Sequence, residues 1–215
     1  MFAFLALHRA RVVRRDELVD ALWPRSAPVN AGDALTVLLS KLRGVLGAEA
    51  LAGRSSVQLL LPAGARVDVE QALAALHRAE SAVAIGSWAR AWSAGLCAQL
   101  VAERPLLPDD DLPWLDEWRR RLEHVLERAL DAYGEACLNL GGGELAAAER
   151  AGRRLIAHNP LHESGYRLLM QSLAERHNTA EALQVYEQAR ATLREELGVA
   201  PGAAMRELHA RLVAG

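Results

Sequence analysis

The sequence predicts a mainly α-helical chain in two parts, and three patterns lead to this prediction. Apolar residues recur at spacings of three and four along most of the chain, which is the period of an amphipathic helix. Within residues 1–66, short helices, a loop and a longer helix precede a candidate β-hairpin. The second half repeats one helix pair with a period of 34 residues. We therefore expect one domain at 1–66 and another at 67–215.

The composition is that of a globular chain of 215 residues, 51% apolar and 24% charged. Cys97 and Cys137 lie 40 residues apart without a C-x-x-C spacing, which argues against a disulfide framework and fits a reducing compartment. No apolar run is long enough to span a membrane, and the apolar start Met1–Leu7 is too short for a signal peptide. We expect a cytoplasmic protein with no membrane partner.

Charge is distributed unevenly along the chain. Residues 1–66 hold nine Lys and Arg against five Asp and Glu, a net +4, and the rest hold sixteen against twenty-two, a net −6. If the chain binds a polyanion, we expect the first part to contact it.

The first part is expected to hold three helices. Phe2–His8 is apolar at nearly every position, which predicts burial on most sides, and Arg9–Val13 is expected to be a connector. Asp16–Trp23 ends before Pro24, and its inward residues are Leu18, Val19, Leu22 and Trp23. After a loop, Asn30–Gly47 forms the long helix, whose apolar stripe is Leu35, Leu38, Leu39, Leu42, Val45 and Leu46.

The opposite face of this long helix is polar and nearly uncharged. It carries Asn30, Asp33, Thr36, Val37, Ser40 and Lys41, with Arg43 on the flank. Such a surface suits the DNA major groove, because short polar side chains, Arg and Lys reach base edges and the cations neutralise phosphates. The alternative is the solvated face of an ordinary amphipathic helix. The order of short helix, loop and longer helix favours a helix-turn-helix.

A wing is expected after the long helix. Two short strands, Glu49–Ala52 and Ser56–Leu61, flank the turn Gly53–Arg54–Ser55. Arg54 at the tip of such a hairpin can contact the DNA backbone or the minor groove. Residues 62–67 are rich in Pro, Ala and Gly, which predicts a linker and the domain boundary.

Two helices and an acidic loop are expected next. The helices span 69–84 and 87–99, and the inward residues of the second are Trp88, Trp92 and Leu96. The loop 102–112 carries three successive aspartates, Asp109–Asp111, which raises the alternative of a metal site. The converging oxygens and glycine turn of a calcium loop are missing, so we interpret these aspartates as solvated acids near a helix N-terminus.

Pro113 is expected to begin a long helix that continues to Leu140. Trp114 and Trp118 lie one turn apart, and we expect them to anchor this helix to the helical bundle. Gly141–Gly143 lacks the Lys-Ser/Thr of a phosphate loop and is expected to form a turn.

The stretch Tyr133–Pro201 contains two copies of one helix pair. In the second copy, the apolar positions are Tyr166, Leu169, Met170, Leu173, Ala182, Leu183, Tyr186, Ala189, Leu193 and Leu197. A shift of 34 residues maps Ala182 onto Ala148, and Pro160 closes the first copy. This pattern is typical of tetratricopeptide repeats. The alternative is an unrepeated helical bundle, because there are only two copies and Gly152 stands where an aromatic residue is usual.

The last helices have recognisable ends. Thr179 is the expected N-cap of the helix that Gly198 ends, and Pro201 prevents its continuation. Residues 202–213 are expected to form a final helix that caps the stack. One helix pair cannot bury its own apolar face, so the pairs must stack on one another.

Signatures of catalysis are missing from the sequence. It contains no H-E-x-x-H, G-x-S-x-G or phosphate-loop motif. His158 and His162 are four residues apart, but Pro160 breaks any helix that would align them. We therefore expect no enzyme activity, no metal and no cofactor.

Several motifs resemble a known family. Leu22-Trp23-Pro24, followed by Leu39-Ser40-Lys41-Leu42-Arg43, is similar to the winged helix of response regulators, in the version found in the Streptomyces antibiotic regulatory protein family. The following part resembles the bacterial transcriptional activator domain through Pro160-Leu161-His162-Glu163, Ala182–Tyr186 and Glu196–Gly202. The resemblance covers essentially the whole chain.

This resemblance implies a DNA-binding transcriptional activator. Its winged helix would bind direct repeats near a promoter as a side-by-side homodimer, and its helical domain would mediate self-association and contact RNA polymerase or other transcription proteins. The partner of the winged helix would be double-stranded DNA. The expected DNA-binding residues are Asn30, Thr36, Ser40, Lys41, Arg43 and Arg54.

The chain departs from the family pattern in its winged helix. The small antiparallel sheet that precedes the first helix in the family has no residues here, so the expected fold is a truncated winged helix-turn-helix followed by tetratricopeptide-like repeats. Val57 stands near the usual wing tyrosine. The alternative function is therefore a protein-interaction module of a larger signalling regulator, with a winged helix that does not function.

Overall fold

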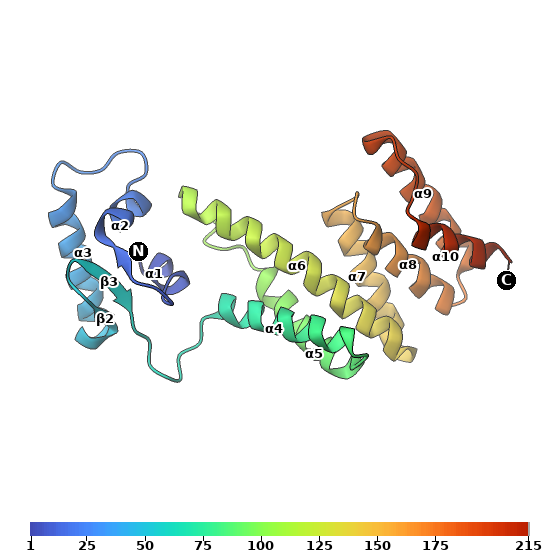
Figure 1. The fold of residues 1–215 in the computed structure, drawn as a ribbon, viewed down its shortest axis with the longest axis horizontal. Helices are drawn as coiled ribbons and strands as arrows, with labels where there is room; N and C mark the ends of the chain where they lie inside the picture. The colour runs from blue at the N-terminus through green and yellow to red at the C-terminus, as the bar shows by residue number, and fades with distance from the viewer. Residues whose placement is uncertain (215) are drawn as a thin grey trace. The chain divides into compact units, whose positions relative to one another are not determined.

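The computed structural model describes residues 1–214 and is mainly helical, with three short strands among these residues (Figure 1). The chain divides into two compact units. The first comprises Met1–Gln71 and Arg104–Leu122, and the second comprises Ala72–Glu103 and the residues from Glu123 onward. None of the helices in this described part combines the length and apolar character that a membrane span requires.

The first unit contains the expected helices and wing. In chain order its elements are α1 Phe2–Leu7, β1 Val13–Arg14, α2 Arg15–Leu22, α3 Ala31–Leu46, the 3-10 turn η1 Ala48–Ala50, β2 Leu51–Ala52 and β3 Ser56–Leu59. The wing prediction is confirmed in its pairing, because β2 and β3 pair antiparallel with Leu51 opposite Leu59. Both strands are shorter than predicted, since Glu49 lies in η1 and β3 ends at Leu59.

Strand β1 was not predicted. The expected connector Arg9–Val13 ends in this strand, which pairs antiparallel with β3 through Val13 opposite Val57. The sheet order is therefore β1-β3-β2, and all three strands follow α1. A two-residue strand gives too short an alternation to be visible in a sequence, and only its partner strand defines it.

The core of the first unit is formed by α1, α2, α3 and one face of the small sheet. Its buried members are Phe4, Leu5, Ala6, Val13, Leu18, Ala21, Leu35, Leu39, Leu51, Val57 and Leu59. The predicted apolar stripe of α3 is wrong at its end, because Val45 is 83% exposed. Helix α2 has eight residues and α3 has sixteen, so α2 can cover only about half of the stripe.

Residues 104–122 belong to the first unit, and this corrects the prediction for the two tryptophans. Trp114 packs edge-on against Phe4 with ring centroids 5.1 Å apart, and Trp118 meets His8 at 5.9 Å. They anchor the start of α6 Pro113–Leu140 to α1 rather than to the helical bundle. Periodicity shows that a helix face is apolar, but it does not identify the surface that this face covers.

Arg119 organises the acidic loop before α6. Its guanidinium donates hydrogen bonds to the carbonyl oxygens of Leu106, Leu107 and Asp110 at 3.2, 2.7 and 2.9 Å. Asp111 pairs with Arg25. Within residues 1–214, no group of three potential His, Cys, Asp or Glu ligands converges on a metal site.

The second unit is helical. Besides the C-terminal part of α6, its elements are α4 Asp68–Ala84, α5 Trp88–Ala102, the 3-10 turn η2 Gly142–Glu144, α7 Leu145–His158, α8 Glu163–Glu175, α9 Thr179–Leu197 and α10 Ala203–Ala214. The predicted inward face of α5 is confirmed for Trp92, which packs against the core, and is wrong for Trp88 and Leu96. Trp88, Trp92 and Leu96 are only half-buried, and the buried face consists of Ala91, Gly95, Ala98, Gln99 and Ala102.

The helices of both predicted repeat copies are present, and α10 packs on α8 and α9 as the expected final helix. Most predicted core positions of α8 and α9 are buried, but Leu197 is 54% exposed. Asn178, rather than Thr179, is the N-cap of α9, and its side-chain oxygen accepts a hydrogen bond from the Glu181 N–H at 3.4 Å. Gly198 ends α9 in a left-handed conformation, as predicted.

Helices α7 and α8 pack closely against each other at two glycines, Gly152 and Gly165. A Cβ at Gly152 would lie 2.9 Å from the backbone nitrogen of Leu169 and 3.1 Å from the carbonyl oxygen of Gly165. A Cβ at Gly165 would lie 2.8 Å from the Cβ of Leu155. Gly152, which departs from the usual repeat pattern, is therefore the residue that allows this close approach.

The two cysteines have different environments within the second unit. Cys97 is exposed and Cys137 is buried, and both are free thiols. Burial raises the pKa of the Cys137 thiol to about 11, which keeps it protonated and unreactive near neutral pH.

Candidate nucleic-acid interface

The predicted DNA-binding residues lie on two neighbouring elements of the first unit. Asn30 precedes α3, four residues lie along α3, and Arg54 lies in the turn between β2 and β3. All are exposed except Arg43, which is half-buried. The structure therefore gathers the six residues on α3 and the wing, and their contact with DNA stays a prediction.

Arg43 connects α3 to the wing. Its guanidinium donates a hydrogen bond to the carbonyl oxygen of Gly53 at 3.0 Å. Gly53 has φ +88°, and a Cβ there would lie 2.1 Å from the carbonyl oxygen of Ser56. Only glycine fits this tight turn, which presents Arg54 at the tip of the hairpin.

Arg15 is a second connection, and sequence reasoning missed it. Its guanidinium donates to Thr36 Oγ1 at 2.6 Å, to the Gly32 carbonyl oxygen at 3.0 Å and to the Arg54 carbonyl oxygen at 3.4 Å. One side chain at the start of α2 therefore contacts both α3 and the wing turn. A cation in the first turn of a helix opposes the helix dipole, and this was the available signal that Arg15 has another role.

The side chains on the α3 face differ in how many hydrogen bonds they already make within the protein. Thr36 donates its hydroxyl to the Gly32 carbonyl oxygen at 2.8 Å and accepts from Arg15, so its hydrogen-bonding capacity is largely used within the protein. Within residues 1–214, the side chains of Asn30, Ser40 and Lys41 make no hydrogen bond or ion pair that meets the usual geometric limits. Those three are the more available groups for a ligand.

Eight of the nine cations of residues 1–66, all except Arg66 in the linker, separate into two groups. Arg9, Arg11, Arg14 and Arg25 pair with Glu70, Glu17, Asp16 and Asp111 respectively. Arg11 and Arg14 lower the pKa of the Glu17 and Asp16 carboxyls through charged hydrogen bonds. By contrast, no carboxylate within the described residues lies within 4 Å of the charged groups of Arg15, Lys41, Arg43 or Arg54.

This separation leaves four cations on or beside α3 and the wing without a carboxylate partner in the described part of the chain, and Asp33 is the one acid on α3. Cations without carboxylate partners can replace the counterions of a phosphate backbone, whereas paired cations must first lose an existing contact. The arrangement suits a polyanion that lies along α3 and the wing turn.

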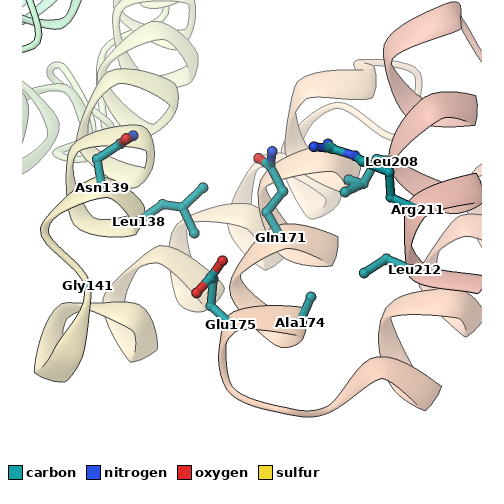
Figure 2. Close-up of a pocket in the computed structure, with 9 residues that line it drawn as sticks. All are labelled: Leu138, Asn139, Gly141, Gln171, Ala174, Glu175, Leu208, Arg211 and Leu212. Carbon is teal, nitrogen blue, oxygen red and sulfur yellow. The ribbon is translucent and has the colours of Figure 1, made fainter. Parts of the chain in front are cut away.

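The second unit has a groove that is a separate candidate site. It has a volume of about 580 Å³ and lies between the end of α6, α8 and α10 (Figure 2). Its lining combines apolar side chains with amides and charges: Leu138, Asn139, Gly141, Gln171, Ala174, Glu175, Leu208, Arg211 and Leu212. A mixed lining of this kind suits a polypeptide segment, whose backbone can pair with Asn and Gln side chains.

Comparison with known proteins identifies a family and several relatives. The model of the bacterial transcriptional activator domain matches residues 67–213. The chain is 31% identical over 219 residues to the regulatory protein AfsR of Streptomyces griseus, an alignment that covers 97% of this chain and 21% of that protein. It is 30% identical over 227 residues to the transcriptional regulator RedD of Streptomyces coelicolor, covering 100% of this chain and 63% of that protein.

A solved structure is similar over nearly the whole chain. The structure of Mycobacterium tuberculosis EmbR, in complex with a low-affinity phosphopeptide, has a TM-score of 0.86 and 25% sequence identity. The match covers 99% of this chain and 57% of that chain. This chain thus spans about a fifth of the length of AfsR and less than two-thirds of RedD or EmbR.

Proposed function

Because the chain belongs to the Streptomyces antibiotic regulatory protein family and carries its bacterial transcriptional activator domain, we propose that it activates transcription by binding promoter DNA with α3 and the wing. The family consists of transcriptional regulators rather than enzymes. The observation that carries the proposal is the set of cations on α3 and the wing without carboxylate partners. Bacterial DNA lies in the cytoplasm, and this is where we propose that the protein acts.

The proposed contacts divide into two kinds. Lys41, Arg54 and the exposed part of Arg43 neutralise phosphates, which supplies affinity and its salt dependence. Asn30 and Ser40 lie on the exposed face of α3, where short polar side chains can reach base edges in the major groove. Arg15 and Arg43 hold the wing turn against α3, so that both elements meet the duplex in one fixed geometry. Direct promoter repeats would then bind two copies side by side.

Selection from a randomised duplex pool at two salt concentrations tests this proposal. We expect the 215-residue chain to enrich a repeated motif. We also expect log affinity to fall with log salt at a slope of roughly −3 per protomer, because about three cations are proposed to neutralise phosphates. Failure to enrich any motif, or affinity that does not change with salt, would contradict DNA binding.

Replacing Lys41 by alanine is expected to weaken binding about equally for all sequences in the selected pool. Lys41 lies on α3 without a carboxylate partner, so its loss should reduce the steepness of the salt slope by about one unit. Fluorescence anisotropy at four salt concentrations measures this. Arg25→Ala is the matched control, since Arg25 already pairs with Asp111 and its loss should leave the slope unchanged.

A second candidate function is suggested by the groove between α6, α8 and α10, which favours a protein partner such as a component of the transcription machinery. We expect Arg211→Glu, inside the groove, to reduce activation in purified transcription several-fold without changing DNA affinity. Arg190→Glu is the control, because Arg190 lies on α9 outside the groove lining and pairs with Glu187. Equal loss of activation by both variants would argue against the groove. Partner binding without any DNA binding would favour the interaction-module alternative.

A further inference from the structure

We infer that Val37 contacts the C5 methyl group of a thymine in the binding site. This inference rests on the proposed DNA-binding function and names one base feature that α3 recognises. Val37 is 54% exposed in the middle of a polar helix face. Thymine presents the one methyl group among the base edges of the major groove, and an apolar side chain is its natural contact.

The position of Val37 on α3 supports this inference. The buried residues Leu35 and Leu39 define the inward side of the helix, and at 100° per residue Val37 lies close to the opposite direction. Its neighbours one turn away are Asp33 and Lys41, both exposed. Val37 is therefore the side chain at the centre of the outward face.

The charges around Val37 determine which part of a duplex this face can meet. Asp33, one turn before Val37, would be repelled by a phosphate backbone, so the line from Asp33 to Val37 must face the bases. Lys41, one turn after Val37, continues this row toward the C-terminal end of the helix. Arg15, which is hydrogen-bonded to Thr36, lies on one flank of the row. Val37 therefore lies between an acid and a cation on the outward row of α3, and we infer that the cation end approaches a phosphate while Val37 faces the bases.

The neighbourhood also lets Val37 approach a base closely. Valine is branched at Cβ and nearly fixed at χ1 in a helix, so its methyl groups are presented in one orientation. Gly44 lies two turns further on the same face, and a Cβ there would have nothing within 4 Å. Without a side chain at that position, the helix can lie deeper in the groove.

The test uses deoxyuridine, which lacks only the C5 methyl of thymidine. After selection of a binding motif with the full chain, each thymine is replaced singly by uracil and the affinity is measured. We expect one position per half-site at which this replacement costs roughly fourfold in affinity, the value for burial of one methyl group. In Val37→Ala, the same replacement should have no effect at that position.

Val45→Ala is the control, because Val45 is also exposed on α3 but lies eight residues along the helix, about 80° around its axis from Val37. It should retain the full uracil effect. The inference is overturned if no thymine responds to the replacement, or if the response is equal in the wild type and in Val37→Ala. If selection yields no motif at all, the proposed function fails and this inference fails with it. If a motif is selected but no uracil replacement changes the affinity, the proposed DNA binding stands and only the contact of Val37 with thymine is rejected.

Discussion

Replacing Gly152 by valine is expected to lower the free energy of unfolding of the second unit by about 3 kcal/mol. A Cβ at this position would already lie 2.9 Å from the Leu169 backbone nitrogen and 3.0 Å from the Leu169 Cβ. These atoms belong to the body of α8 and cannot move as a flexible side chain would. The added methyl groups of valine must therefore separate α7 from α8.

Helix propensity alone would predict the opposite result, a gain in stability when Gly152 is replaced. Within an exposed helix, replacing glycine by alanine gains roughly 1 kcal/mol, and valine gains somewhat less. Overpacking of a close helix crossing costs about 1–3 kcal/mol for a small addition, and more where backbone atoms are the obstacle. The cost exceeds the gain, because Gly152 is buried against α8 rather than exposed.

Hydrogen exchange under increasing denaturant would measure this loss, because it resolves the two units separately. Amides of α8 and α9 should lose protection, and amides of α3 should not. Gly143→Ala is the control, since a Cβ at Gly143 would have nothing within 4 Å. Unchanged protection of α8 in Gly152→Val would show that this crossing tolerates more volume than its distances indicate.

The parts of the fold that could be predicted from sequence are those that a local period encodes. The Asn30–Gly47 helix and the Pro113–Leu140 helix were located to within about a residue, because their apolar positions and their glycine or proline ends agree. The family motifs predicted the winged helix and the activator domain. No local pattern indicated β1, because a two-residue strand exists only through its pairing with β3.

The sequence predicted which helix and hairpin form the candidate site, but it did not predict the hydrogen bonds that join them. The outward face of α3 follows from helical spacing, and so does the set of side chains that it presents. The role of Arg15 does not, because its acceptors Gly32, Thr36 and Arg54 lie 17 to 39 residues away in the sequence. For the same reason, the close approach at Gly152 and the partner of Trp114 depend on which surfaces meet. That information lies in tertiary packing rather than in any window of the sequence.

Replacing Trp114 by alanine is expected to destabilise the first unit by about 2 kcal/mol and to leave the second unit unchanged. Trp114 packs edge-on against Phe4 and joins the core that contains Leu18, Leu35 and Val57. Truncation of a fully buried large aromatic side chain costs about 3–5 kcal/mol, and Trp114 is only half-buried, which reduces the expected loss. Since this residue lies more than forty positions beyond the linker at 62–67, we expect the winged helix to need a part of the chain that follows its predicted boundary.

The same hydrogen-exchange experiment separates this prediction from a general loss of stability. Amides of α3 and β3 should lose protection in Trp114→Ala, while those of α8 should keep it. Trp114→Phe is the control, because it retains an aromatic ring against Phe4. It also loses no hydrogen bond, since the indole N–H of Trp114 has no acceptor within residues 1–214. If α3 keeps its protection in Trp114→Ala, the winged helix folds stably without the packing that residues 104–122 provide. If α3 loses protection in Trp114→Ala but not in Trp114→Phe, the proposed DNA-binding unit is discontinuous in sequence. We then expect a fragment that ends at residue 66 to bind DNA only when the temperature is low enough to keep it folded.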